Sequence, residues 1–181
     1  GYLQRVERKR GADGEPWDPF HFISHPGYLV QGLSWAQRFE AALYHYRQEA
    51  ATFDEALLGR IYSAEGFVLW SAEVDAHQFA MRLGLAGEGS LEGDLCVRLV
   101  ADGRCIGTMN FVWADAAMFG GASGPTLFIT RCQTHVYDEL AVFRACFKQN
   151  SPPYFCLAAL AGLALACGVP ALHAVQHRAQ M

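Results

Sequence analysis

The chain has 181 residues, of which 52% are hydrophobic and 18% are charged. That length suits one domain with its own core, and the composition excludes a disordered polar chain. Lys and Arg number 14 against 18 Asp and Glu, which leaves a net charge of −4. A mildly acidic chain with no long basic run lacks the surface that nucleic-acid binding needs, so we expect no nucleic-acid partner.

The sequence favours a cytoplasmic protein. Its longest apolar run, Tyr154 to Cys167, is about one helical turn too short for a membrane span. No apolar segment follows the early charges as a secretory signal would require. The six cysteines lie in apolar stretches without a CxxC pair or zinc-type spacing, which favours reduced thiols. We expect no membrane span, while peripheral contact with a membrane surface stays open.

Residues 1–33 are rich in glycine and proline and have no helical or strand period. We expect an N-terminal arm there, followed by a single domain over residues 34–181. Aromatic side chains in the second half of the arm favour its packing on the domain. These aromatic residues are Trp17, Phe20, Phe22 and Tyr28.

The domain begins with helical periodicity. Apolar residues recur at intervals of three and four from Ser34 onward, as on one face of an amphipathic helix. Ser34 with Gln37 has the form of a capping box, and Thr52 with Glu55 repeats it. The pattern predicts two helices with a break near residue 51.

After Gly66 the apolar period falls to two, which is typical of half-buried strands. The predicted strands cover residues 67–73, 78–85, 94–100, 104–113 and 126–133. Asp102 and Gly103 are a strong hairpin signal, because both central positions of a type I′ turn need positive φ. The sequence therefore predicts an antiparallel meander of four to five strands.

Two helices are expected after the meander. Asp138 opens a short one, because acidic side chains suit the positive end of a helix dipole. Pro152 and Pro153 start a second helix, Tyr154 to Cys167, which is apolar nearly all round and is therefore expected to be buried. Gly168 ends that helix.

A final strand is expected over residues 169–175. N-terminal helices, an antiparallel meander, two helices and a last strand make an α+β fold. The last two predicted strands are joined by a helical crossover, which favours parallel neighbours whose carboxyl ends open a cleft at one edge.

Polar residues at these strand ends are the first candidates for a site. Arg131 and Gln133 share one face of their strand, where they either form the rim of a pocket or face solvent. In the expected cleft, Arg131 and Gln133 would meet His173 from the last strand, with Trp113 as a wall. We assign Arg131, Gln133 and Trp113 to substrate binding.

Two histidines are the candidate catalytic groups. A group transfer needs donors for a developing oxyanion and a base for the accepting amine, and His135 or His173 could be that base. Cys132 lies on the opposite face from Arg131, so a structural role is favoured over a nucleophilic one.

No metal site is expected. The two HxxxH pairs lie outside the predicted helices, and in an extended chain residues four apart are about 13 Å from each other, too far to share an ion. The sequence also lacks a phosphate loop, a dinucleotide-binding fingerprint and a GxSxG motif. It therefore identifies no cofactor.

Several short motifs occur in a characteristic order. They are His25-Pro26-Gly27-Tyr28-Leu29, His45-Tyr46-Arg47, Ile61-Tyr62, Leu69-Trp70, Glu92-Gly93-Asp94-Leu95, Asp102-Gly103, Leu127-Phe128-Ile129-Thr130-Arg131-Cys132-Gln133, Pro153, Gly168 and Ala174-Val175. Together they resemble the VirK/YbjX family of bacterial proteins over about residues 25–177. The resemblance implies a role in virulence, envelope stress or tolerance of antimicrobial peptides, and a domain that continues past the last strand. It supplies no catalytic residues.

The element order is also similar to the amino-terminal portion of acyltransferases of the GCN-related type, an analogy at the level of the fold. Those enzymes bind the pyrophosphate of coenzyme A at a glycine-rich turn after the central strand. Here the segment from Gln133 to Asp138 has no glycine, and Asp138 would repel a phosphate. These features argue against coenzyme A.

Two functions therefore stay open. One is an acyl or aminoacyl transferase relative that acts on a lipid, a peptide or another small molecule in the expected pocket. The other is a non-catalytic binding module of the virulence or envelope-stress response, whose aromatic arm contacts a partner protein or a membrane surface.

Overall fold

A computed structural model describes residues 23–86, 93–169 and 171–175. Its six strands form one sheet in sequence order. They are β1 (Phe67–Val74), β2 (His77–Leu85), β3 (Leu95–Ala101), β4 (Arg104–Asp115), β5 (Pro125–Thr134) and β6 (Leu172–Ala174). The first five are antiparallel, and β6 is parallel to β5. The predicted α+β fold with an antiparallel meander is confirmed.

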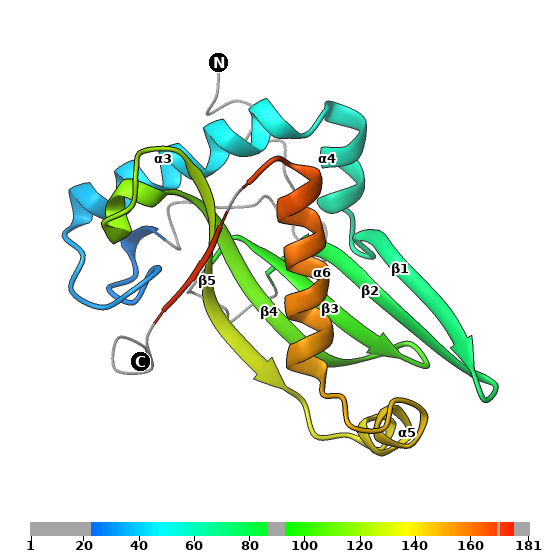
Figure 1. The fold of residues 1–181 in the computed structure, drawn as a ribbon. Coiled ribbons are helices and arrows are strands. Elements are labelled where there is room, and N and C mark those ends of the chain that lie inside the picture. Colours follow the sequence, from blue (N-terminus) through cyan, green and yellow to red (C-terminus); the bar gives the residue numbers. More distant parts are fainter. Residues whose placement is uncertain (1–22, 87–92, 170, 176–181) are drawn as a thin grey trace.

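Helices cover both faces of the sheet (Figure 1). They are α3 (Trp35–Thr52), α4 (Glu55–Ile61), the 3-10 helix η1 (Ala116–Phe119), α5 (Asp138–Cys146) and α6 (Pro152–Ala166). Helix α6 packs on β3, β4 and β5, while α3 crosses β4 near the other end of the sheet. No helix in the described part of the chain is long and apolar enough to cross a membrane.

Two hydrophobic clusters lie on opposite faces of the sheet. The larger cluster joins α5 and α6 to alternate residues of β2 to β5, among them Met81, Phe111 and Leu127. The smaller cluster lies under α3 and includes Val112 and Phe128, which are the sequence neighbours of residues in the larger one. Strand alternation thus divides the apolar residues of β4 and β5 between two helical layers.

The helix boundaries follow local capping chemistry. Ser34 and Gln37 form the predicted capping box, with hydrogen bonds of 3.3 and 2.9 Å. The second box, predicted at Thr52, is wrong because Thr52 is the last residue of α3. Asp54 instead caps α4 by accepting a hydrogen bond from the Leu57 backbone N–H at 2.7 Å.

Two hairpins turn through left-handed residues. Asp102 and Gly103 have φ values of 46° and 81°, as the predicted type I′ turn requires. Asp75 and Ala76, with φ values of 50° and 65°, make the same kind of turn between β1 and β2. Alanine is disfavoured at positive φ, which explains why the sequence pattern does not identify that second turn.

The prediction that the apolar helix is buried all round is wrong. Only one stripe of α6 faces the sheet, at every fourth residue. This stripe is Pro152, Cys156, Leu160 and Ala164. On the outer side, Tyr154 is 67% and Leu165 is 79% exposed. A single helix on one face of a sheet buries only the side that touches it. Helix α6 therefore has more apolar residues than the core of this fold requires.

The last strand is shorter than predicted, but its pairing is confirmed. Strand β6 runs parallel to β5, with Leu127 opposite Leu172 and Ile129 opposite Ala174. The Val175 backbone N–H then donates to the Ile129 carbonyl at 2.9 Å. The register places the end of β6 beside the middle of β5, so β5 extends beyond it.

A close backbone approach at Gly107 yields a test of the packing between α6 and the sheet. A Cβ atom at Gly107 would lie 2.6 Å from Cβ of Pro152, the first residue of α6. We expect Gly107→Ala to lower the free energy of unfolding by about 1–3 kcal/mol, because the start of α6 must move away. Urea denaturation measures the change.

The matched control is Gly162→Ala in the middle of α6. A Cβ atom there meets no heavy atom within 4 Å. Alanine favours helix over glycine by up to about 1 kcal/mol, so this variant should be more stable than the wild type. Equal stability of Gly107→Ala and the wild type would contradict the close contact.

Candidate functional site

The end of β5 holds three of the predicted site residues. Arg131 is half-buried and lies opposite Asn110 of β4, next to an irregularity in the pairing of the two strands. Gln133 is exposed on the same face, and His135 follows the strand. The His135 backbone N–H donates to the Ile106 carbonyl at 3.0 Å, which fixes the chain as it leaves the sheet.

His173 lies apart from this group. It is opposite Phe128, three residues before Arg131, or about 10 Å along the strand. Its Nδ1 atom is 2.9 Å from the Thr126 hydroxyl, and its ring stacks on Phe119 with centroids 5.0 Å apart. The structure therefore does not bring His173 together with Arg131, since β6 ends before β5 does.

Trp113 belongs to the core. It is 1% exposed and makes an edge-on contact with Phe53 at 6.1 Å between ring centroids. Its position opposite Leu127 places it in the cluster under α6, on the opposite face from Val112 and Phe128. The structure thus gives Trp113 a packing role and does not expose it to a cleft at the end of β5.

The cysteines offer no activated nucleophile. Cys132 is exposed, and partial burial of its thiol raises the pKa above the usual value. Burial raises the pKa of Cys96 and Cys156 to about 12. All six thiols are free, and within the described residues no group of three or more His, Cys, Asp or Glu side chains could hold a metal ion. At neutral pH these thiols are protonated and poorly nucleophilic.

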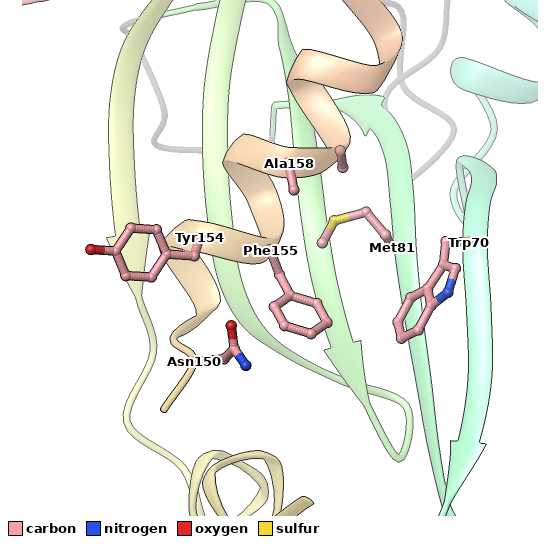
Figure 2. Close-up of a pocket in the computed structure, with 7 residues that line it drawn as sticks. Trp70, Met81, Asn150, Tyr154, Phe155 and Ala158 are labelled. Carbon is pink, nitrogen blue, oxygen red and sulfur yellow. The ribbon is translucent and has the colours of Figure 1, made fainter. Parts of the chain in front are cut away.

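A groove of about 620 Å³ lies between α6 and the first two strands (Figure 2). Its lining residues are Trp70, Met81, Asn150, Tyr154, Phe155, Ala158 and Ala159. The volume falls within the range of about 300–1,000 Å³ that is usual for small-ligand pockets. Small side chains at residues 158 and 159 leave the space open above the sheet.

Aromatic contacts hold the wall of the groove. Trp70 meets Phe155 edge-on with ring centroids 5.9 Å apart, and it meets Phe147 at 6.4 Å. Phe143 contacts both Phe147 and Phe155 at 5.1 Å. Figure 2 shows Phe155 and Trp70 facing the space from α6 and β1, while the ring of Tyr154 points away from Trp70. Interlocked rings make this wall preformed.

A ligand in the groove would be held by shape and apolar contact, because none of the described residues that line it is charged. Asn150 supplies a polar amide beside Phe155, whereas the Tyr154 hydroxyl points away from the space (Figure 2). Asn150 already uses one amide N–H on the Lys148 carbonyl at 3.3 Å, which leaves its side-chain oxygen as an acceptor. The arrangement suits a neutral apolar group with one polar anchor.

A second feature is a buried tyrosine–carboxylate cluster, formed by Tyr28, His45, Tyr46, Glu49, Tyr62 and Asp94. The hydroxyls of Tyr28 and Tyr46 donate to the two carboxyl oxygens of Asp94 at 2.7 and 3.1 Å. The Tyr62 hydroxyl donates to Glu49 at 2.5 Å. Burial, together with the Glu49 carboxyl, holds the pKa of Tyr62 well above its usual value, so Tyr62 remains a donor.

His45 satisfies a backbone N–H of β4 that has no partner on β3. Its Nδ1 accepts a hydrogen bond from the Trp113 backbone N–H at 3.0 Å, beyond the pairing of β4 with the first residue of β3. His45 and Asp94 are 0% and 2% exposed, while Tyr62 is half-buried, so most of the tyrosine–carboxylate cluster is shielded from solvent. Its groups bond to one another within the protein, which makes the cluster a structural tie.

Sequence reasoning missed both features. Every residue of the tyrosine–carboxylate cluster except Glu49 lies in one of the motifs that carry the family resemblance. The available signal was therefore the Tyr, His and Asp residues in those motifs. For the groove, the available signal was Trp70 on an early strand together with a helix that is apolar on every side. Neither pattern specifies which distant segments meet.

A family model described as "Protein of unknown function (DUF535)" matches residues 23–181. The match covers most of the chain, and the protein belongs to this family. No curated protein and no solved structure matches it.

We expect Tyr46→Phe to lower the free energy of unfolding by about 1–3 kcal/mol. The substitution removes a hydroxyl that donates to a buried carboxyl oxygen at 3.1 Å and leaves that oxygen without this donor. Thermal or urea denaturation measures the loss. The control is Tyr154→Phe at a residue that is 67% exposed, for which the change should stay within about 0.5 kcal/mol. Equal stability of the two variants would contradict a structural role for the cluster.

Proposed function

We propose that this member of the DUF535 family binds a lipid-like molecule by seating an aliphatic chain in the groove beside α6. The observation that carries the proposal is the groove itself, a preformed space of about 620 Å³ whose lining, as far as the structure describes it, is aromatic and aliphatic apart from Asn150 and has no charged side chain. Apolar contact supplies about 25 cal/mol for each Å² removed from water, so such a lining favours a long apolar group.

The lining supports a lipid over a peptide. A peptide backbone carries a donor and an acceptor at nearly every residue, and these need partners when they leave water. The polar group that the groove offers is the Asn150 amide, which suits one polar end. An aliphatic chain leaves no polar group unsatisfied in the rest of the space.

Ala158→Phe tests the groove. The larger side chain occupies space that a ligand needs, and loss of contact with two methylene groups costs about 1.6 kcal/mol, or more than tenfold in affinity. We therefore expect Ala158→Phe to weaken binding of a fluorescent fatty-acid probe at least about tenfold. Displacement of the probe by unlabelled fatty acids, and the emission of the half-exposed Trp70, provide two readouts.

Ala166→Phe is the matched control. Residue 166 is an exposed alanine of the same helix and lies outside the groove. Ala166→Phe should bind the probe as the wild type does. A separate variant, Trp70→Phe, should remove the change in tryptophan emission on probe binding. Absence of probe binding to the wild type, or equal binding by Ala158→Phe and Ala166→Phe, would refute the assignment.

Acyl or aminoacyl transfer is a second candidate function. Polar residues at the end of β5 and just after it support this candidate. They are Arg131, Gln133 and His135, and they lie past the end of the shorter β6. A guanidinium or amide there could donate to an oxyanion, and His135 could accept a proton. His173 lies in a different part of the surface, and this candidate function does not require it.

Calorimetric titration with acyl-coenzyme A, acyl carrier protein and aminoacyl donors tests the second candidate. We expect Arg131→Ala to abolish donor binding while the fold persists, because a half-buried guanidinium at a strand end contributes little to the core. Silence from all three donors removes this candidate. An Arg131→Ala variant that unfolds, yet keeps its affinity per folded molecule, would make Arg131 structural.

The finer identification as a VirK/YbjX protein belongs to the same proposal. It rests on the ordered motifs between residues 25 and 177, and it carries the virulence and envelope-stress role with it. The cytoplasmic location is a separate proposal, which rests on the six cysteines in apolar stretches. Lipid binding fits such a role, because envelope stress changes the supply of lipids and amphiphiles. Peripheral membrane contact through the exposed apolar side of α6 is compatible with the same function.

A further inference from the structure

Two arginines face each other on the sheet surface opposite α6. Arg82 of β2 and Arg98 of β3 are direct cross-strand partners, and both are half-buried. Their neighbours Met81 and Leu99 point into the core under α6, so alternation turns the arginines to the other face. Like charges directly opposite each other destabilise a strand pair. Such a pair calls for a compensating anion.

Both guanidinium groups reach the turn between α4 and β1. Arg82 Nη1 donates to the carbonyl and to a carboxyl oxygen of Glu65, at 3.1 and 3.2 Å. Arg98 Nη2 lies only 3.0 Å from where a Cβ atom of Gly66 would be, and 2.6 Å from that of Gly84. The two glycines leave the space that the Arg98 guanidinium occupies, so the two cationic heads converge beside residues 65 and 66.

Within the described residues, the charge at this turn is only partly balanced. Glu65 pairs with Arg82, but its side chain is 83% exposed. Arg98 makes no hydrogen bond and no ion pair with any described residue. The Nε of Arg82 is buried without a hydrogen-bond partner in the described part of the chain. Arg60, whose guanidinium lies 4.5 Å from the ring centre of Phe67, adds positive charge to the same turn.

We propose that Arg82 and Arg98 form a binding site for a phosphate group. A guanidinium presents five N–H donors in a planar fork, and two forks from adjacent strands can address different oxygens of one tetrahedral anion. A carboxylate is already present in Glu65 and satisfies only Arg82. The site lies on the opposite face of the sheet from the groove, and the inference is independent of the proposed lipid binding.

The test compares the full chain in phosphate and in chloride at equal ionic strength. The wild type should show a higher Tm in phosphate, and titration calorimetry should give saturable phosphate binding. Arg98→Gln should lose the phosphate-dependent shift and weaken phosphate binding at least about tenfold. In chloride the same variant should be at least as stable as the wild type, because the like-charge pair has been removed.

Two further variants separate the site from general electrostatics. Arg47→Gln removes the same charge from an exposed position on α3 and should keep the phosphate shift. Arg98→Lys keeps the charge but loses the fork, so it should bind phosphate more weakly than the wild type and more tightly than Arg98→Gln. It also covers the case in which Arg98→Gln does not fold.

Three outcomes would overturn the proposal. They are no difference between phosphate and chloride for the wild type, an equal loss in Arg47→Gln and Arg98→Gln, and a phosphate shift that survives in Arg98→Gln. Titration with inorganic phosphate and with glycerol phosphate identifies the source of the anion. Equal affinities support free phosphate, and tighter binding of the monoester supports a phosphorylated small molecule. Binding of the fatty-acid probe should be unchanged in Arg98→Gln, so failure at one site leaves the other testable.

Discussion

The carboxyl group of Asp94, held between two tyrosine hydroxyls, is the contact that positions the other parts of the fold. A carboxyl group that is 2% exposed has to find its hydrogen bonds inside the protein, and Tyr28 and Tyr46 provide them. These donors come from the segment before α3 and from α3 itself, while Asp94 stands at the start of β3. Its carbonyl accepts from Ala86, which closes the β2–β3 pair at 3.0 Å. One side chain thereby ties a helix to a strand register.

That tie fixes where the sheet is covered and where it is open. With α3 held across β4 on one face and α6 on the other, neither helix lies over β1 and the outer part of β2. Consecutive residues of β2 then open toward opposite sides, with Met81 at the floor of the groove and Arg82 at the turn beside Glu65. The two proposed sites therefore follow from one placement of the helices and from the alternation of one strand.

The fold was predictable wherever local chemistry decides it. Strand alternation, the Asp102-Gly103 turn and the capping box at Ser34 each depend on neighbours within a few residues, and the structure has all three. The expected cleft depended on where β6 stops against β5. That register is set by contacts of β6 with the rest of the domain, and it separates His173 from Arg131. The groove joins β1 to α6 across about 80 residues of chain, a pairing that no local period encodes.

Helix α6 has no charged side chain, yet one side of it is exposed to solvent. Burial was expected from composition, yet the sheet needs only every fourth residue of α6. Soluble proteins rarely expose large contiguous apolar surfaces without a use for them. Two sides of this helix carry apolar residues beyond the need of the core: the side that forms the groove with Ala158 and Ala159, and the side that exposes Leu165. The proposed apolar ligand in the groove would account for the first, and contact with a membrane surface, as the source of such a ligand, would account for the second. The core does not require the apolar composition of α6, whereas the proposed lipid binding would require it.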